Sequence, residues 1–215
     1  MNAGRVSERT LALDLDGTLL DCGPRQVEAL HAVLGEPYPD PTGFWQAKRG
    51  GATTLEALVA LGMAEQQAAE IAAQWRITVE DDDLLAVDTL LPAVEQTLAA
   101  ARTSVDRLVI ITARRRGDAA VAQCERLGLM TLLDEVIAVD PTAASESKAA
   151  VLTDIAAFAF IGDTASDARA AAAAGVPFAA VTTGQHAREV LLAAIDTPIL
   201  ASLDEAINHL LREHG

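Results

Sequence analysis

The sequence predicts an α/β fold, a parallel sheet covered by helices on both faces. From residue 90 onward, short apolar segments alternate with segments of helical spacing, which is the pattern of successive βα units. Including one near the N-terminus, the segments expected to form strands are residues 11–13, 108–111, 135–139, 158–161 and 178–181. Parallel neighbours need long connections between them, and the helical segments supply these connections.

The segment 24–87 reads as helical and contains no convincing strand. Apolar residues recur there at helical spacing, most clearly in Ala68, Ile71, Ala72 and Trp75. The acidic run 80–83 at the end of the segment is expected to be a solvated linker. A helical unit is therefore expected between the first and second strands of the sheet.

The composition is that of a soluble globular protein. Apolar residues make up 51% of the 215 residues, without a long apolar stretch free of charge. The formal charge of −15 argues against nucleic acid and membrane surfaces as partners, because binding to their phosphates depends on Lys and Arg. Cys22 and Cys124 give neither metal-ligand spacing nor a disulfide framework, and the first ten residues lack the apolar core of a signal peptide. These features indicate a cytoplasmic location.

The first expected strand ends in two carboxylates, Asp14 and Asp16, followed by Gly17. Side chains alternate along a strand, so both carboxylates are expected on one side. They repel each other and gain from burial only with a cation or a proton between them. The pair suits a hard divalent cation such as Mg²⁺, or a nucleophile beside a general acid–base group. Gly17 allows a sharp turn where a substrate must approach the backbone.

Polar residues directly follow three of the expected strands. Asp14 and Asp16 follow the first, Thr112 follows the second, and Asp163 follows a later one. In an open parallel sheet, the ligand crevice lies outside the carboxyl ends of the strands. These four side chains are therefore expected to meet at one site.

The same residues resemble the four motifs of the haloacid dehalogenase superfamily of aspartate-nucleophile phosphohydrolases. Residues 14–18 resemble its first motif and residues 110–112 its second. Lys148, early in a helical segment, resembles the third motif, and residues 162–167 resemble the fourth. The four motifs occur in order and at appropriate spacing over nearly the whole chain, which makes coincidence an unsatisfactory explanation.

The resemblance implies a three-layer, Rossmann-like core with an inserted all-helical cap. The core would comprise residues 1–21 and 89–215, and the cap residues 22–88. The subgroup indicated is the one that contains phosphoglycolate phosphatases and β-phosphoglucomutases. In it the cap closes over the site, excludes water and contacts the leaving group. The chain departs from the family pattern at Ala93, where relatives usually carry glycine after proline.

Carried over residue by residue, the resemblance implies a covalent mechanism. Asp14 would attack phosphorus and form an aspartyl-phosphate, while Asp16 would protonate the leaving oxygen and then deprotonate water. Mg²⁺ would be held by Asp14, by the backbone carbonyl of Asp16 and by Asp163, with Asp167 supporting that shell. The phosphoryl oxygens would be bound by three residues: Thr112, Ala113 and Lys148.

Three basic residues are candidates for contacts to the leaving group of the substrate. Lys48 and Arg49 form a basic pair beside two glycines in an otherwise acidic segment, and they are candidates for substrate specificity. A solvated loop pair is an equal alternative for them. Arg114, two residues after Thr112, is a further candidate for a substrate contact.

The expected function is hydrolysis of a small phosphorylated metabolite by a Mg²⁺-dependent phosphatase, either a monomer or a homodimer. A sugar-phosphate mutase of the same superfamily is one alternative, and a non-catalytic binding or regulatory protein on the same fold is another. The non-catalytic alternative predicts loss of a key residue, but Asp14, Asp16, Lys148 and Asp163 are all present. A metal-free dehalogenase is disfavoured because that branch lacks the second aspartate, here Asp16.

Overall fold

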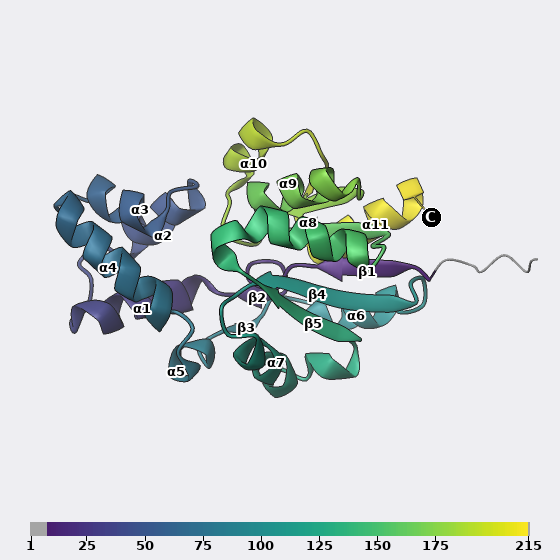
Figure 1. Ribbon diagram of the computed structural model, residues 1–215, viewed down its shortest axis with the longest axis horizontal. Coiled ribbons are helices and arrows are strands. Elements are labelled where there is room, and N and C mark those ends of the chain that lie inside the picture. Colours follow the sequence, from purple (N-terminus) through teal and green to yellow (C-terminus); the bar gives the residue numbers. More distant parts are fainter. Residues whose placement is uncertain (1–7, 215) are drawn as a thin grey trace, which may run out of the picture.

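The core of the protein is a six-stranded sheet, seen in a computed structural model that describes residues 8–214 (Figure 1). The strand order is β5-β4-β1-β6-β7-β8, and every neighbouring pair is parallel, as predicted. The strands are β1 (Thr10–Leu13), β4 (Arg107–Ala113), β5 (Glu135–Val139), β6 (Ala159–Gly162), β7 (Phe178–Val181) and β8 (Ile199–Leu200). Part of the N-terminal segment used to infer a cytoplasmic location, residues 1–7, lies outside the described residues.

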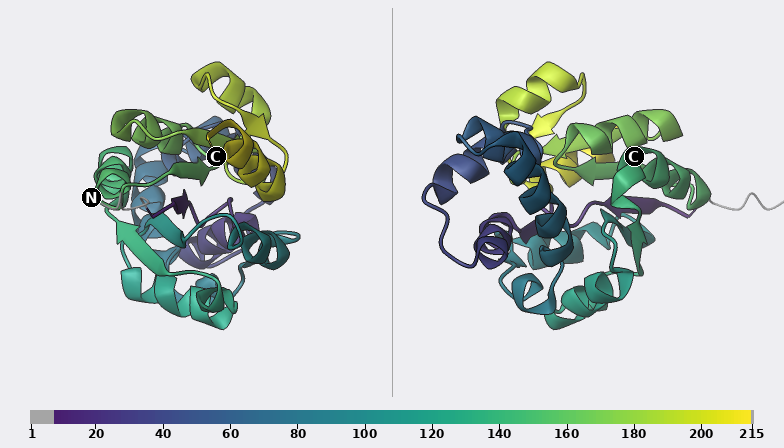
Figure 2. Two further views of the ribbon diagram at one scale, coloured as in Figure 1. Left: turned by 90° about the vertical axis from the view of Figure 1, so that its right-hand side faces the viewer. Right: turned by 60° about the vertical axis from the view of Figure 1, so that its left-hand side comes forward.

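Helices cover both faces of this sheet and make three layers (Figure 2). Because side chains alternate along a strand, Leu11 and Leu13 of β1 enter one apolar core and Ala12 enters the other. The first core is closed by α6 (Val94–Ala101), α7 (Gly117–Arg126) and α11 (Leu203–His214). The second is closed by α8 (Ala144–Asp154), α9 (Ala165–Ala174) and α10 (Arg188–Ala194), while short 3₁₀ helices precede β5 and α8: η1 (Leu129–Thr131) and η2 (Pro141–Ala143). Within residues 8–214, no helix combines the length and apolarity needed to cross a membrane.

A helical insertion, helices α1 to α5, lies beyond the carboxyl ends of the strands (Figure 1). The chain leaves and returns through a two-stranded antiparallel ribbon, β2 (Leu20–Asp21) and β3 (Thr89–Leu90). The insertion has its own apolar core, centred on Leu30, Phe44 and Leu58. Its helices are α1 (Gly23–Leu34), α2 (Pro41–Arg49), α3 (Thr54–Ala60), α4 (Glu65–Thr78) and α5 (Asp82–Leu85).

The acidic run after α4 differs from its prediction as a solvated linker. Glu80 is only 6% exposed, although the three aspartates that follow it are exposed. Its carboxylate accepts the backbone N–H groups of Arg115 at 3.2 Å and Arg116 at 2.9 Å. These N–H groups precede α7, where the first amides of a helix need outside acceptors and favour negative charge. Glu80 therefore links the insertion to the core through two hydrogen bonds.

The sequence pattern predicts a helix from about Leu91 to Ala101, but α6 begins only at Val94. The residue before it, Ala93, has a φ of 63° in the left-handed region. That conformation suits glycine, because it brings a Cβ atom too close to the backbone. The family departure at Ala93 therefore places a strained alanine at the start of a helix.

Candidate active site

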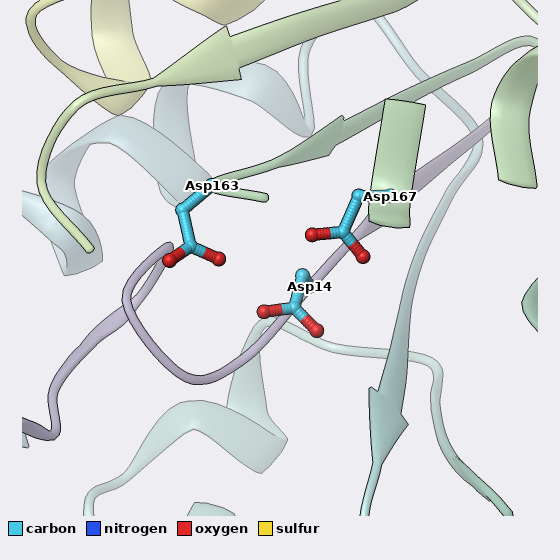
Figure 3. Close-up of side chains that lie close together, drawn as sticks. All are labelled: Asp14, Asp163 and Asp167. Carbon is cyan, nitrogen blue, oxygen red and sulfur yellow. The ribbon is translucent and has the colours of Figure 1, made fainter. Parts of the chain in front are cut away.

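Three buried carboxylates meet at the carboxyl ends of β1 and β6. Asp14 directly follows β1, Asp163 directly follows β6, and Asp167 lies in the first turn of α9. Oxygens from the three side chains all lie within 4.8 Å of one another, and the carboxylates face a shared space (Figure 3). Since β1 and β6 are parallel neighbours, their ends bring Asp14 and Asp163 together, as the strand-end pattern indicated.

Two glycines bring the backbone close to Asp163. Gly17 has a φ of +81°, and a Cβ atom there would lie 2.4 Å from Oδ2 of Asp163. A Cβ atom on Gly184 would lie 2.0 Å from the same oxygen. The tight fit lets the N–H of Gln185 donate to that oxygen at 2.5 Å. At Gly17 the group that approaches the backbone is thus a carboxylate of the protein, and the approach of a substrate there stays a prediction.

Lys148 of α8 is the cation of this cluster. Its Nζ donates to Oδ1 of Asp14 at 2.5 Å and to Oδ1 of Asp167 at 2.6 Å. Burial would lower the pKa of Lys148, but the two carboxylates outweigh burial and raise it. Burial raises the pKa of Asp14 despite the opposing ammonium of Lys148. One ammonium therefore leaves three close carboxylates short of positive charge.

The donor set fits a hard divalent cation. All three side chains offer oxygen ligands, which such cations prefer. Oδ1 of Asp163 is buried and has no hydrogen-bond partner among the described residues. Burial, followed by the charges of Asp14 and Asp167, raises the pKa of Asp163 well above its usual range. A bound cation would satisfy the unpartnered oxygen and offset the repulsion together.

The side chain of Asp16 lies outside this cluster, although a shared face with Asp14 was predicted. Arg114 donates to both of its oxygens, from Nε at 2.8 Å and from Nη2 at 2.6 Å. Arg25 of α1 donates to Oδ1 from Nη2 at 2.5 Å. Burial alone would raise the pKa of Asp16, but Arg114 and then Arg25 outweigh burial and hold the pKa well below its usual range. β1 ends at Leu13, so the alternation of strand side chains does not extend to Asp16.

Two buried residues that the sequence analysis did not single out complete these contacts. Asp88, just before β3, accepts from Nε of Arg25 at 3.1 Å. Gln123 of α7 donates to Asp88 at 2.9 Å and accepts from Arg114 at 2.7 Å. Burial raises the pKa of Asp88 to about 6, with Arg25 opposing. The residues are 35 positions apart, and no motif marks either of them.

A cavity of about 750 Å³ lies between the core and the helical insertion. Asp14, Asp16 and Asp163 reach it from the core, and Lys48 and Trp75 reach it from the insertion. The three phosphate-binding candidates, Thr112, Ala113 and Lys148, also line it, as does Asp167, which was predicted to support the metal site. The cavity thus joins the acidic cluster to a surface that the insertion supplies.

Lys48 and Arg49, the basic pair of the insertion, lie in different environments. Lys48 is 6% exposed, donates to Oγ1 of Thr54 at 3.1 Å and lies 4.8 Å from the centre of the Trp75 ring. Burial lowers its pKa to about 8. No carboxylate within residues 8–214 forms an ion pair with it. Arg49 instead donates to the carbonyl of Thr182 at 3.2 Å, and its own carbonyl accepts the N–H of Ala187 at 2.9 Å.

Comparison with known proteins places this site in a family. Residues 8–175 match the family described as haloacid dehalogenase-like hydrolase. A phosphoglycolate phosphatase of Caulobacter vibrioides is 30% identical over 209 residues, covering 91% of this chain and 88% of that protein. A plasmid-encoded phosphoglycolate phosphatase of Cupriavidus necator is 29% identical over 188 residues, covering 80% of each.

Solved structures share the fold at lower identity. A haloacid dehalogenase-like hydrolase from Streptococcus pneumoniae is 21% identical and superimposes with a TM-score of 0.73, over 95% of this chain and 99% of that one. Protein tyrosine kinase A of Mycobacterium tuberculosis is 23% identical with a TM-score of 0.70, over 96% and 99%. These structures establish the fold, and the family match together with the relatives confirms the enzyme class predicted from the motifs, a phosphatase. The chain belongs to the haloacid dehalogenase-like hydrolases.

Proposed function

We propose that the protein is a Mg²⁺-dependent phosphomonoesterase that acts on a small metabolite through an aspartyl-phosphate. The observation that carries this proposal is the buried cluster of Asp14, Asp163 and Asp167 around Lys148 in a chain of this family. The cluster is rich in oxygen ligands, and it adjoins a cavity large enough for a small ligand.

In this proposal Asp14 is the nucleophile. Lys148 holds its Oδ1, whereas Oδ2 accepts no hydrogen bond from the described residues and is the oxygen that attacks. The phosphoryl group would lie between Asp14, Thr112 and Lys148, so that the hydroxyl and the ammonium bind its equatorial oxygens. When bound by Asp14, Asp163, Asp167 and the Asp16 carbonyl, Mg²⁺ would supply positive charge at the same oxygens.

Asp16 would move protons at the leaving and attacking oxygens. Its two guanidinium neighbours favour the ionised form, which is the form that deprotonates the incoming water. The proton for the leaving oxygen can come from the substrate, because the second pKa of a phosphate monoester is about 6 and its monoanion carries a proton. Asp16 would pass this proton across to the leaving oxygen.

The substrate we propose carries a second anionic group, such as the carboxylate of phosphoglycolate. Lys48 lies at the cavity as a buried cation without a carboxylate partner among the described residues, and it can bind such a group. The two relatives named as phosphoglycolate phosphatases support this choice. In this role residues 22–88 act as a cap over a core of residues 1–21 and 89–215, and the cap recognises the leaving group.

Phosphate release from phosphoglycolate, with and without chelator, tests the proposal directly. Activity should vanish with chelator and return with Mg²⁺. Asp14→Asn should abolish both turnover and the acid-stable phosphoprotein, because an amide cannot act as the nucleophile. Asp154→Asn, an exposed carboxylate on α8, is the matched control and should retain both. Full activity in chelator, or a phosphoprotein formed by Asp14→Asn, would contradict the assignment.

A further inference from the structure

The carboxylate of Asp16 is held on both oxygens by two buried guanidinium groups. Arg114 makes a bidentate contact, and Arg25 adds a third hydrogen bond, to Oδ1. A planar guanidinium that bonds both oxygens fixes the plane of a carboxylate as well as its position. The side chain of Asp16 is still 26% exposed, and it lines the cavity.

Each arginine is itself anchored, so the contacts form a closed ring of five side chains. Gln123 accepts from Arg114 and donates to Asp88, and Asp88 accepts from Arg25. The ring contains two guanidinium groups and two carboxyl groups, with Gln123 as a neutral bridge. Its positive charge is therefore matched internally, unlike that of Lys48. This matching argues against Arg114 as a contact for an anionic group of the substrate.

The ring is assembled from both parts of the molecule. Arg114 and Gln123 belong to the core, whereas Arg25 lies in α1 of the helical insertion and Asp88 in the segment that returns from it. Arg25 also donates from Nη1 to the carbonyl of Val79, just after α4, at 3.1 Å. One guanidinium thus contacts the Asp16 loop, the insertion and its return segment together.

We infer that Arg25 and Arg114 are positioning residues that orient the Asp16 carboxylate, and that their clamp is complete only while the insertion is seated on the core. The inference rests on the proposed function, because it assigns a role to the residues around the proton-transferring group. Asp88 and Gln123 keep the two guanidinium groups aligned. Neither arginine contributes directly to substrate affinity.

Substrates with different leaving groups separate positioning from substrate binding. Ethyl phosphate and phosphoglycolate release alkoxides that need a proton, whereas p-nitrophenyl phosphate releases a stable anion that does not. Arg114→Lys and Arg25→Lys keep the charge but lose the planar contacts. In both variants kcat/KM for the two alkyl esters should fall by about 10–100-fold and by a similar factor for both, part of the range for general acid–base catalysis. The kcat/KM for the aryl ester covers only the steps up to release of the aryl anion, so it should change by less than about threefold, since that leaving group needs no proton.

Two further variants make the test specific. Asp88 does not contact Asp16, but Asp88→Asn removes the negative charge opposite Arg25 and one hydrogen-bond acceptor. This variant should therefore give the same pattern, with a smaller fall in the alkyl-to-aryl ratio. Arg115→Lys is the matched control, because Arg115 bonds Ile77 and Glu80 of the insertion and not Asp16, and it should keep the wild-type ratio. The alkyl-to-aryl ratio of kcat/KM is measured on one sample, so a partly unfolded fraction lowers both values equally and does not change the ratio.

Three outcomes would overturn the inference. An unchanged or raised alkyl-to-aryl ratio in both Arg25→Lys and Arg114→Lys would show that the clamp does not orient Asp16. A rise in KM for phosphoglycolate, but not for ethyl phosphate, would make either arginine a substrate contact. Wild-type protein that hydrolyses none of the three esters would remove the proposed function and the inference with it, whereas the first two outcomes leave the proposed function intact.

Discussion

At the scale of single residues, the cationic side chains of the site differ in the groups that they contact. Lys148 is paired with two carboxylates, and Arg25 and Arg114 share Asp16. Lys48 donates to the hydroxyl of Thr54 and lies over the Trp75 ring, and it forms no ion pair within residues 8–214. Consecutive residues on a helix point about 100° apart, which follows from 3.6 residues per turn, so Lys48 can reach the cavity while Arg49 bonds the core.

Neutralising Lys48 tests its role as the cation for a second anionic group. Lys48→Met should raise KM for phosphoglycolate about tenfold, which corresponds to roughly 1.4 kcal/mol, and should affect ethyl phosphate much less. Arg49→Met is the matched control and should not show this selectivity, because Arg49 bonds Thr182. Equal losses on both esters in Lys48→Met would remove Lys48 from the specificity site.

The pH dependence of wild-type KM gives an independent check on Lys48. Burial lowers its pKa to about 8 in the free protein, so its charge is present below that pH and lost above it. KM for phosphoglycolate should therefore rise as the pH passes upward through about 8, and this rise should be absent in Lys48→Met. A rise of the same size in the variant would assign it to another group.

The sequence was sufficient to place most of the site residues, but it could not place the clamp around Asp16. Asp14 and Asp163 follow buried strands, and the ends of parallel strands must meet at one edge. The contact between Arg25 and Asp88 spans 63 residues, and that between Arg114 and Asp16 spans 98. Such pairs depend on how distant segments of the chain pack together in the fold, which local patterns do not encode.

At the scale of elements, long periodic segments were predictable and short ones were not. The pattern identified β1 and β4 to β7 because each carries a run of apolar residues, although in β5 only Val139 is buried. The strands β2, β3 and β8 have only two residues each, so they exist through hydrogen bonds to distant partners. The start of α6 was misplaced because Ala93 adopts a left-handed conformation that its side chain does not favour.

Replacing Ala93 by glycine should stabilise the protein. The residue is exposed, so no packing is lost, and relief of a left-handed alanine is worth about 1 kcal/mol after the entropy of glycine is subtracted. For a chain of this size that corresponds to a melting temperature about 2–4 °C higher. Ala100→Gly, at an exposed position within α6, is the matched control and should lower the melting temperature. A lower melting temperature in Ala93→Gly would contradict the strain argument.

At the scale of the whole molecule, the insertion packs against the core across the cavity. The molecule as a whole carries a strong negative charge. The net charge is −15, and the cavity places the acidic cluster opposite the insertion. Glu80 and Arg49 fasten the insertion to the core at two separate places, through the start of α7 and through the segment after β7. Positive charge is therefore supplied locally, by Lys48, by Lys148 and by the cation that the cluster fits.

The acidic cluster should make the stability of the whole chain depend on divalent cations. A ligand that binds only the folded state at about 100 times its dissociation constant adds about 2.7 kcal/mol, which is a rise of about 5–10 °C in melting temperature for a chain of this length. Mg²⁺ should produce this rise, and sodium chloride at matched ionic strength should not, because screening acts on all charges alike.

Asp163→Asn should remove the destabilisation that the close carboxylates cause when no cation is bound. Its amide oxygen can still accept the N–H of Gln185, but the buried repulsion from Asp14 and Asp167 is gone. The variant should therefore melt at or above the wild-type temperature in chelator, and it should lose most of the stabilisation by Mg²⁺. A variant that is less stable in chelator and is still stabilised by Mg²⁺ would show that Asp163 serves the structure alone, and that the cation binds elsewhere.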